Sequence, residues 1–333
     1  MKIGYLGAGT WGTALACLLA SNGHHVKVWD INDEILNELD KKRKHPKLIN
    51  SKIPKEIKYV HSFEEAIEDA DIIVESVTSA GIRNAFERIK SFKGENICPI
   101  IITSKGIEQN TSKLFTEVFL EIFSEENKNL VGCLGGPTLA VEVAQNLPAS
   151  VVGAAYSDDL KKKIVELFNT PAFRVYPNSD VVGVGFGGAM KNIIAIACGL
   201  SDGLGFGDNT KAALMTRGLH EIRKLSKSKG CKAETLNGLS GLGDLCVTCL
   251  SIHSRNYRFG NLLSKGYTIK NAKKEIGMVV EGTYSVVSAM ELGKRNSIPI
   301  PITEAIYGII YEQISPNSAV KALLTRTIKE EHL

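Results

Sequence analysis

The chain has 333 residues, of which 44% are hydrophobic and 23% charged, and its formal net charge is +4. A usual domain has about 100–200 residues, so this length predicts two domains, and the composition excludes a disordered chain. No apolar run predicts a membrane span, and the small net charge does not indicate a nucleic-acid surface, so we expect a soluble protein without a nucleic-acid partner.

The amino terminus and the cysteines indicate a cytoplasmic protein. The first six residues enter a glycine cluster directly and lack the charged, apolar and small-residue regions of a secretory signal. Seven cysteines stand among apolar neighbours, an odd number that fits a reducing compartment. Cys246 and Cys249 form a lone CxxC with no second pair or histidine at ligand spacing, so we expect no metal site.

Up to about residue 178, short branched apolar runs alternate with amphipathic segments. This alternation predicts a Rossmann-like α/β domain, a doubly wound parallel sheet with β-α-β order throughout. The predicted strands are Lys2–Leu6, His25–Asp30, Ile72–Val77, Ile97–Thr103, Leu130–Leu134, Ser150–Ala154 and Phe173–Val175. The predicted helices include Trp11–Ser21, Phe63–Ala70, Ile82–Ile89, Ser112–Phe123 and Leu160–Phe168.

After about residue 179 the strand patterns end. Long helical patterns follow, broken by glycine clusters, and predict a mostly α-helical second domain. They cover Ala189–Gly199, Asn209–Lys229, Arg255–Ser264 and Ser285–Leu292. The predicted domains are therefore 1–178, for a dinucleotide, and 179–333, for substrate and catalysis.

A GxGxxG motif lies between the first strand and the first helix. It reads Gly7-Ala8-Gly9-Thr10-Trp11-Gly12. In this context Gly7 would allow the tight turn, Gly9 the approach of a pyrophosphate, and Gly12 the packing of helix on strand. The positive end of the helix dipole would face the phosphates. A purely structural glycine turn is the alternative.

The second strand is predicted to end in a carboxylate, Asp30, eighteen residues after Gly12. A carboxylate there can accept hydrogen bonds from the adenosine ribose and would repel a 2′-phosphate, which favours NAD over NADP. Lys27 and the basic run 41–44 could offset this repulsion, so NADP remains possible. Asp30 could instead cap a helix or lie at the surface.

Two lysines stand in places that suggest a role. Lys105 follows a predicted strand at its carboxyl end, where ligands bind in parallel sheets, although it could be a solvated loop lysine. Lys191 belongs to a helix that is apolar on nearly every face, so it must be partly buried. Burial and nearby cations favour a neutral amine that can act as a general base. A lysine that extends its amine to solvent or pairs with a carboxylate is the alternative.

The chain resembles the bacterial type of NAD(P)-dependent glycerol-3-phosphate dehydrogenase over essentially its whole length. The matching blocks are GAGTWGTALA, SKGIE, GGPTLAVEV, GGAMKNIIAIACGLSDGLGFGDNTKAALMTRGL, GLSGLGDLCVTC, SRNYRFG and VVEG. The resemblance implies reversible reduction of dihydroxyacetone phosphate to sn-glycerol 3-phosphate, a precursor of glycerophospholipids. It also suggests a homodimer through the helical domain.

Site residues follow from the resemblance by motif. Lys191 corresponds to the family's proton acceptor, and Lys105 to the lysine that contacts both ligands. The resemblance places Asn192, Asp244 and Thr248 in the catalytic surroundings. It assigns Gly136 and Thr138 to a substrate-binding turn, and Ala140, Val279 and Glu281 to contacts with the cofactor.

The segment Ser254-Arg255-Asn256 matches the family's SRN block. An arginine fork between two small hydrogen-bonding residues at a helix start suits a dianionic phosphate, so Arg255 is the predicted phosphate anchor, with a further contact to the cofactor. An arginine exposed at the surface is the alternative.

Three positions depart from the usual family pattern. The family often has Glu or Gln at Gly185 and Pro at Thr78, and many bacterial members have a basic or neutral residue near Asp30. Cofactor preference therefore cannot be transferred directly from the family.

Two other functions remain open. One is a different β-hydroxyacid dehydrogenase, acting on a sugar acid or ketopantoate, and the SRN and GGPT blocks argue against it. The other is a catalytically silent dinucleotide sensor, which would need neither Lys191 nor Arg255.

Overall fold

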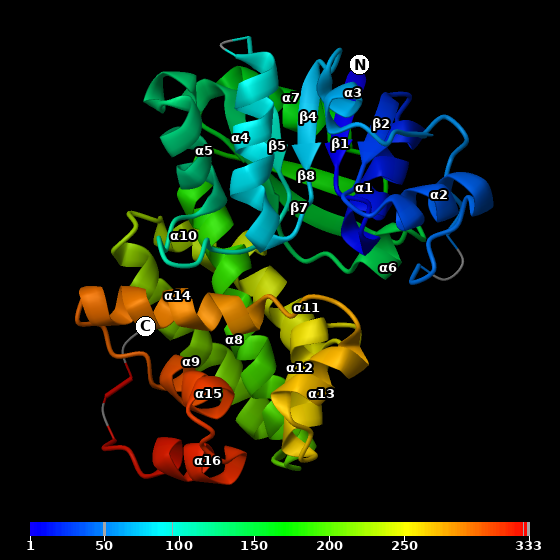
Figure 1. Cartoon of the computed structure of the whole chain (residues 1–333). Helices are drawn as coiled ribbons and strands as arrows, with labels where there is room; N and C mark the ends of the chain where they lie inside the picture. The colour runs from blue at the N-terminus through cyan, green and yellow to red at the C-terminus, as the bar shows by residue number, and fades with distance from the viewer. Residues whose placement is uncertain (49–50, 95, 329, 332–333) are drawn as a thin grey trace. The chain divides into compact units, whose positions relative to one another are not determined.

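The computed structural model describes residues 1–48, 51–94, 96–328 and 330–331. The chain divides into two compact units (Figure 1). Unit 1 comprises Met1–Lys105 and Lys113–Gly185, and unit 2 comprises Gly106–Ser112 and Phe186–Leu333.

Unit 1 contains a sheet whose eight strands, within the described residues, have the order β3-β2-β1-β4-β5-β6-β7-β8. The chain starts near the middle and winds outward in both directions, which confirms the doubly wound Rossmann-like class. The strands are β1 Lys2–Leu6, β2 His25–Trp29, β3 Lys58–Tyr59, β4 Ile72–Glu75, β5 Ile100–Ile102, β6 Val131–Gly135, β7 Ala149–Ala155 and β8 Phe173–Asn178.

Helices accompany the strands, and several begin at the side-chain caps that their sequences provide. Asn32, Ser62 and Ser157 each accept backbone N–H bonds at a helix start. The helices of this unit are α1 Thr10–Ser21, α2 Asp33–Lys42, α3 Phe63–Ile67, α4 Ile82–Lys93, α5 Phe115–Phe123, α6 Ala140–Val143 and α7 Asp158–Phe168, with short 3₁₀ turns at Ser79–Gly81 and Glu125–Leu130.

The prediction of β-α-β order throughout is wrong at one connection. β6 and β7 are antiparallel, whereas the other neighbouring strands are parallel. Parallel neighbours need a long crossover, usually a full helix, and the segment between these two strands holds only the four-residue α6. The chain therefore reverses direction there.

Unit 2 is helical, and no strand occurs in its described residues, which confirms the predicted class. Its helices are α8 Val181–Gly203, which begins in unit 1, α9 Gly207–Lys227, α10 Ala233–Asn237, α11 Asp244–Leu250, α12 Arg255–Ser264, α13 Ile269–Ile276, α14 Gly282–Arg295, α15 Pro301–Tyr311 and α16 Pro316–Leu324. A π-helical turn, Leu239–Gly243, leads directly into α11. One of the glycine clusters that separate the predicted helices is thus itself partly helical.

Helix α8 is the central apolar helix of this unit. It alone, among the described helices, is long and apolar enough to cross a membrane, and 89% of its most apolar window is buried inside the protein. Such burial is what a core helix shows.

Two glycines bring other backbones against α8. A Cβ at Gly187 would lie 2.5 Å from the carbonyl oxygen of Ser240, and one at Gly199 would overlap the carbonyl oxygen of Tyr257. Main chain therefore packs on main chain at both points, which fixes the helix between the π-helical turn and α12.

Candidate active site

The glycine motif forms a tight turn between β1 and α1. Gly7 has φ +106, and a Cβ at Gly12 would overlap the carbonyl oxygen of Gly7. A Cβ at Gly9 would find no atom within 4 Å, so open space lies over its backbone. The first turn of α1 has neither a side-chain cap nor an acidic residue, which leaves its positive end available to an anion. This geometry fits a bound pyrophosphate.

Asp30 lies just after β2 and beside this turn. Its Oδ2 accepts a hydrogen bond of 2.6 Å from the N–H of Ala8, and its Oδ1 accepts one of 2.9 Å from the N–H of Asn32. The carboxylate thus stabilises the glycine turn. Asn32, not Asp30, caps α2.

Lys105 is half-buried and contacts the predicted substrate turn. Its Nζ donates to the carbonyl oxygen of Gly136 at 2.9 Å and to Oγ1 of Thr138 at 3.1 Å. The ammonium also lies 6.0 Å from the ring centroid of Trp11, at the outer limit of a cation–π contact. Gly136 has φ +136, so glycine suits the turn that presents its carbonyl to Lys105.

In unit 2, Lys191 is 6% exposed and Asp244 is fully buried. Lys191 Nζ lies 2.5 Å from Asp244 Oδ1 and donates to Thr248 Oγ1 at 2.8 Å. The Thr248 hydroxyl donates in turn to the Asp244 carbonyl oxygen at 2.6 Å. These residues form the lysine cluster, in which α11 supplies two partners of a lysine on α8.

The SRN segment forms the start of α12. Ser254 is the N-cap, and its Oγ accepts from the N–H of Tyr257. Arg255 Nη1 donates to the carbonyl oxygen of Val279 at 2.9 Å, and its other guanidinium nitrogens make no hydrogen bond within the described part of the chain. Burial lowers the pKa of Arg255, an effect that Glu281 opposes, and the guanidinium stays charged at neutral pH.

Asn256 is buried and lies between α8 and α14. Its Nδ2 donates to Asn192 Oδ1, and its Oδ1 accepts from the N–H of Gly282, both at 2.9 Å. These bonds connect the residue after Lys191 with the start of α14. In this structure the side chain of Asn256 therefore has protein partners.

Comparisons with known proteins match both parts of the chain to one family. The profile described as "NAD-dependent glycerol-3-phosphate dehydrogenase N-terminus" matches residues 2–161, and the C-terminus profile of the same family matches residues 180–321. The chain belongs to this family.

Relatives of this glycerol-3-phosphate dehydrogenase family cover the chain almost completely. Proteins named glycerol-3-phosphate dehydrogenase [NAD(P)+] from Protochlamydia amoebophila and Chlamydia caviae are 56% and 50% identical to this chain. Each alignment covers 100% of this chain and 99% of the relative's length. The crystal structure of a glycerol-3-phosphate dehydrogenase from Coxiella burnetii has a TM-score of 0.92 at 37% identity, covering 97% of this chain and 98% of that one.

The dehydrogenase residues predicted from the sequence fall into two groups. In unit 1, hydrogen bonds join Trp11, Asp30, Lys105, Gly136 and Thr138 to the strand ends or to one another, with Thr10 starting α1 and Ala140 starting α6. In unit 2, one group comprises Lys191, Asn192, Asp244, Thr248, Ser254, Arg255, Asn256, Val279 and Glu281.

Sequence reasoning missed Glu75, a fully buried carboxylate at the end of β4. Its Oε1 accepts from the N–H of Val77 at 2.5 Å and from the hydroxyl of Ser104 at 2.8 Å. Ser104 precedes Lys105, so Glu75 anchors the turn that carries this lysine. A charged residue within the apolar run Ile72–Val77 was the signal available in the sequence.

Proposed function

We propose that this chain catalyses the reversible reduction of dihydroxyacetone phosphate to sn-glycerol 3-phosphate with NADH or NADPH. The observation that carries the proposal is the buried Lys191 ammonium, paired with Asp244 and Thr248 in unit 2. A buried ionic group is costly unless it is paired, and an ammonium at such a place can serve acid–base chemistry. We assign the dinucleotide to domain 1–178 and catalysis to domain 179–333.

The dinucleotide would be held by the glycine turn, through Gly7, Gly9, Thr10, Trp11 and Gly12. The open space above Gly9 and the uncapped start of α1 support this fit. The nicotinamide, when bound, supplies the hydride that adds to substrate C2. A carboxylate at Asp30 favours NADH, because a 2′-phosphate would meet its negative charge.

Lys191 supplies the proton that the reduction requires. In the salt bridge with Asp244 its amine is an ammonium, and transfer of one N–H proton to the C2 oxygen converts the carbonyl to a hydroxyl as the hydride reaches C2. Lys191 is left neutral and regains a proton from water. In the oxidising direction the neutral amine accepts the hydroxyl proton, and Thr248 orients it.

Arg255 binds the substrate phosphate. Its unused guanidinium N–H groups can donate to two phosphate oxygens, and the start of α12 adds favourable backbone dipoles. We also assign substrate contacts to Ser254, Asn192 and Asn256. Asn192 and Asn256 are hydrogen-bonded to each other, and this bond would rearrange where the substrate requires it.

Other assignments concern half-buried residues of the two units. Lys105, held by Gly136 and Thr138, would polarise the substrate oxygen and contact the cofactor. Ala140, Val279 and Glu281 would contact the cofactor. We further propose a cytoplasmic homodimer that feeds glycerophospholipid synthesis.

The test is oxidation of NADH and of NADPH by the purified protein, followed at the nicotinamide absorbance band. Dihydroxyacetone phosphate is the substrate and unphosphorylated dihydroxyacetone the control. We expect turnover that requires the phosphate and is faster with NADH. Turnover of ketopantoate or a sugar acid instead, or nucleotide binding without turnover of any of these, would overturn the proposal.

A further inference from the structure

Unit 2 contains a cavity of about 510 Å³, partly open to solvent, that the proposed reaction does not use. Its walls come from α8, α9, α15 and α16 and from residues that follow α16. Ligand pockets commonly measure roughly 300–1,000 Å³ and have mostly apolar walls with a few polar groups. The size is thus suitable for a small organic ligand.

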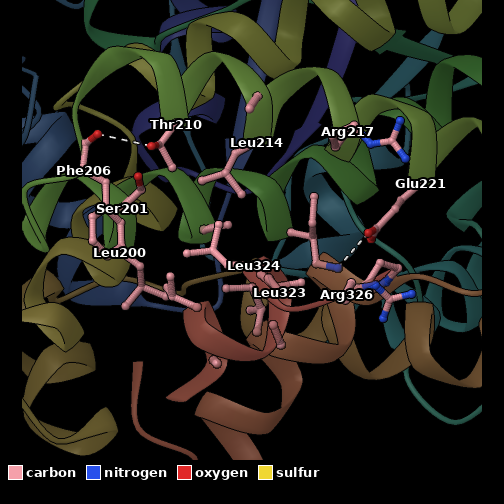
Figure 2. A pocket seen from close by; sticks show the side chains of 18 of the residues that line it. Leu200, Ser201, Phe206, Thr210, Leu214, Arg217, Glu221, Leu323, Leu324 and Arg326 are labelled. Carbon is pink, nitrogen blue, oxygen red and sulfur yellow. Dashed lines mark hydrogen bonds between the residues drawn. The ribbon is translucent and has the colours of Figure 1, made fainter. Parts of the chain in front are cut away.

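The walls of this cavity are mostly aliphatic. They include Leu200, Leu214, Ile302, Ile306, Leu323 and Leu324. Figure 2 shows leucine side chains of α9 and α16 between the two ends of the cavity, and Leu200 of α8 beside Ser201 at one end. Contact with water is unfavourable for such surfaces, so an aliphatic chain would bind here.

Charged groups gather at one end. Figure 2 shows Arg217, Glu221 and Arg326 at this end and Phe206 and Thr210 at the other. Neither Arg217 nor Arg326 forms an ion pair or a side-chain hydrogen bond within the described residues. Lys224 adds a further cation to the lining.

Within the described residues Glu221 forms no ion pair with either arginine, and its carboxylate accepts hydrogen bonds from the segment that starts α15. Its Oε1 accepts from the N–H of Ile302 at 2.7 Å, and its Oε2 accepts from the N–H and the hydroxyl of Thr303 at 3.1 and 3.0 Å. Burial also raises the pKa of Glu221 to about 7, so part of its negative charge is absent near neutral pH. Glu331 is the other carboxylate in the lining.

The neighbouring histidine shows the excess of positive charge. Burial lowers the pKa of His220, and Lys224, Arg217, Arg223 and Lys227 lower it further. An anionic group at this end would therefore be stabilised.

We propose that this cavity binds a fatty-acid anion, with the aliphatic chain between the leucines and the carboxylate at Arg217 and Arg326. The two features on which this rests are the aliphatic walls and the complementary charge at one end. The site is separate from the residues assigned to the dehydrogenase reaction.

The experiment is isothermal titration calorimetry of the full-length protein with octanoate, decanoate and dodecanoate, each below its micelle concentration. We expect one site per chain, with affinity that rises about fourfold for each added methylene until the cavity is filled. Dodecyltrimethylammonium, which has the opposite charge, should bind at least about tenfold more weakly.

Variants test the position of the site. Arg217→Gln should weaken dodecanoate binding about tenfold or more, because it removes a charge-assisted contact. Arg223→Gln is the matched control, because it removes one positive charge from the same helix outside this cavity, and it should weaken binding much less than Arg217→Gln does. Ala305→Phe should fill the cavity and abolish binding, with circular dichroism as the check of folding.

Three results would overturn the proposal. They are no dodecanoate binding, equal losses for Arg217→Gln and Arg223→Gln, or affinity independent of chain length. Sedimentation velocity distinguishes the main rival: if Ala305→Phe converts a dimer to monomers and dodecanoate does not bind, a second copy of the chain covers this surface.

Discussion

The glycine turn of unit 1 and the lysine cluster of unit 2 are built in different ways. The turn uses backbone geometry within six consecutive residues, and its open space above Gly9 requires the absence of a side chain. The cluster uses side chains that are 53 and 57 residues apart in sequence and are buried together. Atoms added to the backbone site would therefore block its ligand, whereas loss of one side chain from the buried cluster would leave the others without a contact that they need.

Replacing Lys191 should have the largest effect. We expect Lys191→Met to lower kcat roughly 10²–10⁴-fold, since the proton donor is lost, while NADH binding is retained. Removing the ammonium that pairs with the buried Asp244 carboxylate should also cost about 3–5 kcal/mol of stability. Steady-state turnover of dihydroxyacetone phosphate and fluorescence titration with NADH measure the two properties.

Two further variants separate chemistry from stability. Lys191→Met combined with Asp244→Asn should regain much of the stability and remain inactive. Lys270→Met, at an exposed position on α13, should behave as the unchanged chain. Near-normal turnover by Lys191→Met would remove the lysine cluster from the mechanism.

Gly9→Ala tests the backbone site. The φ of −66 and ψ of −178 suit alanine, so the variant should be as stable as the unchanged chain or slightly more stable. The new methyl group would occupy the space for the pyrophosphate, and we expect the Kd for NADH to rise about tenfold or more. Thermal unfolding and NADH titration are the measurements. Unchanged NADH affinity would show that the nucleotide does not approach this backbone.

Glu75→Val tests the residue that connects β4 with the Lys105 turn. Loss of the acceptor for Val77 and Ser104 should loosen the turn and raise the KM for dihydroxyacetone phosphate about tenfold, equivalent to about 1.4 kcal/mol. Glu75→Gln keeps an acceptor oxygen and should restore most of the affinity. An equal loss of kcat in both variants, with KM unchanged, would contradict a positioning role through Lys105.

The last prediction concerns the pH dependence of stability at Glu221, which leaves activity aside. Its folded pKa of about 7 exceeds the ordinary value of 4.5, mainly because of burial, so the folded state binds the proton more tightly. This contribution to stability is complete below about pH 4.5 and is lost as the pH rises through 7. The shift corresponds to about 3 kcal/mol at most.

Glu221→Gln removes this titration. The unfolding temperature of the unchanged chain minus that of the variant should be several degrees higher at pH 5.5 than at pH 8.5. Calorimetry at the two pH values measures this difference in unfolding temperature. The contribution of His220 cancels in the difference, because both proteins contain this residue. A difference that is constant with pH would rule out titration of Glu221 in this range.

The sequence predicted the parts of the fold that depend on local pattern. The glycine motif, the main strands and the helix around Lys191 are local signals, and the structure contains each of them. The observed helix bounds differ from the predicted ones at the ends. Helix α5, for example, begins at Phe115 and not at Ser112, because Leu114 occupies the N-cap. The two-residue β3 has too few residues for a pattern.

Other features depend on pairing that the sequence does not encode locally. The antiparallel pairing of β7 with β6 depends on which edge of the sheet the chain reaches after the short connection between them. The contact of Lys191 with Asp244 requires α8 and α11 to be packed, although resemblance had grouped the residues. Glu75 was missed because its run was treated as a uniformly apolar strand.

The close packing of α8 has a consequence for variation among descendants of this chain. At Gly187 and Gly199 the helix meets carbonyl oxygens of Ser240 and Tyr257, so its depth is set by atoms that every residue type shares. Substitutions in the surrounding leucines and isoleucines can change the shape of the core without moving the helix axis. In a saturation mutagenesis library we expect the two glycines to accept no replacement, while many neighbouring apolar positions accept several. The main-chain contacts would therefore preserve the position of Lys191 while the surrounding core changes.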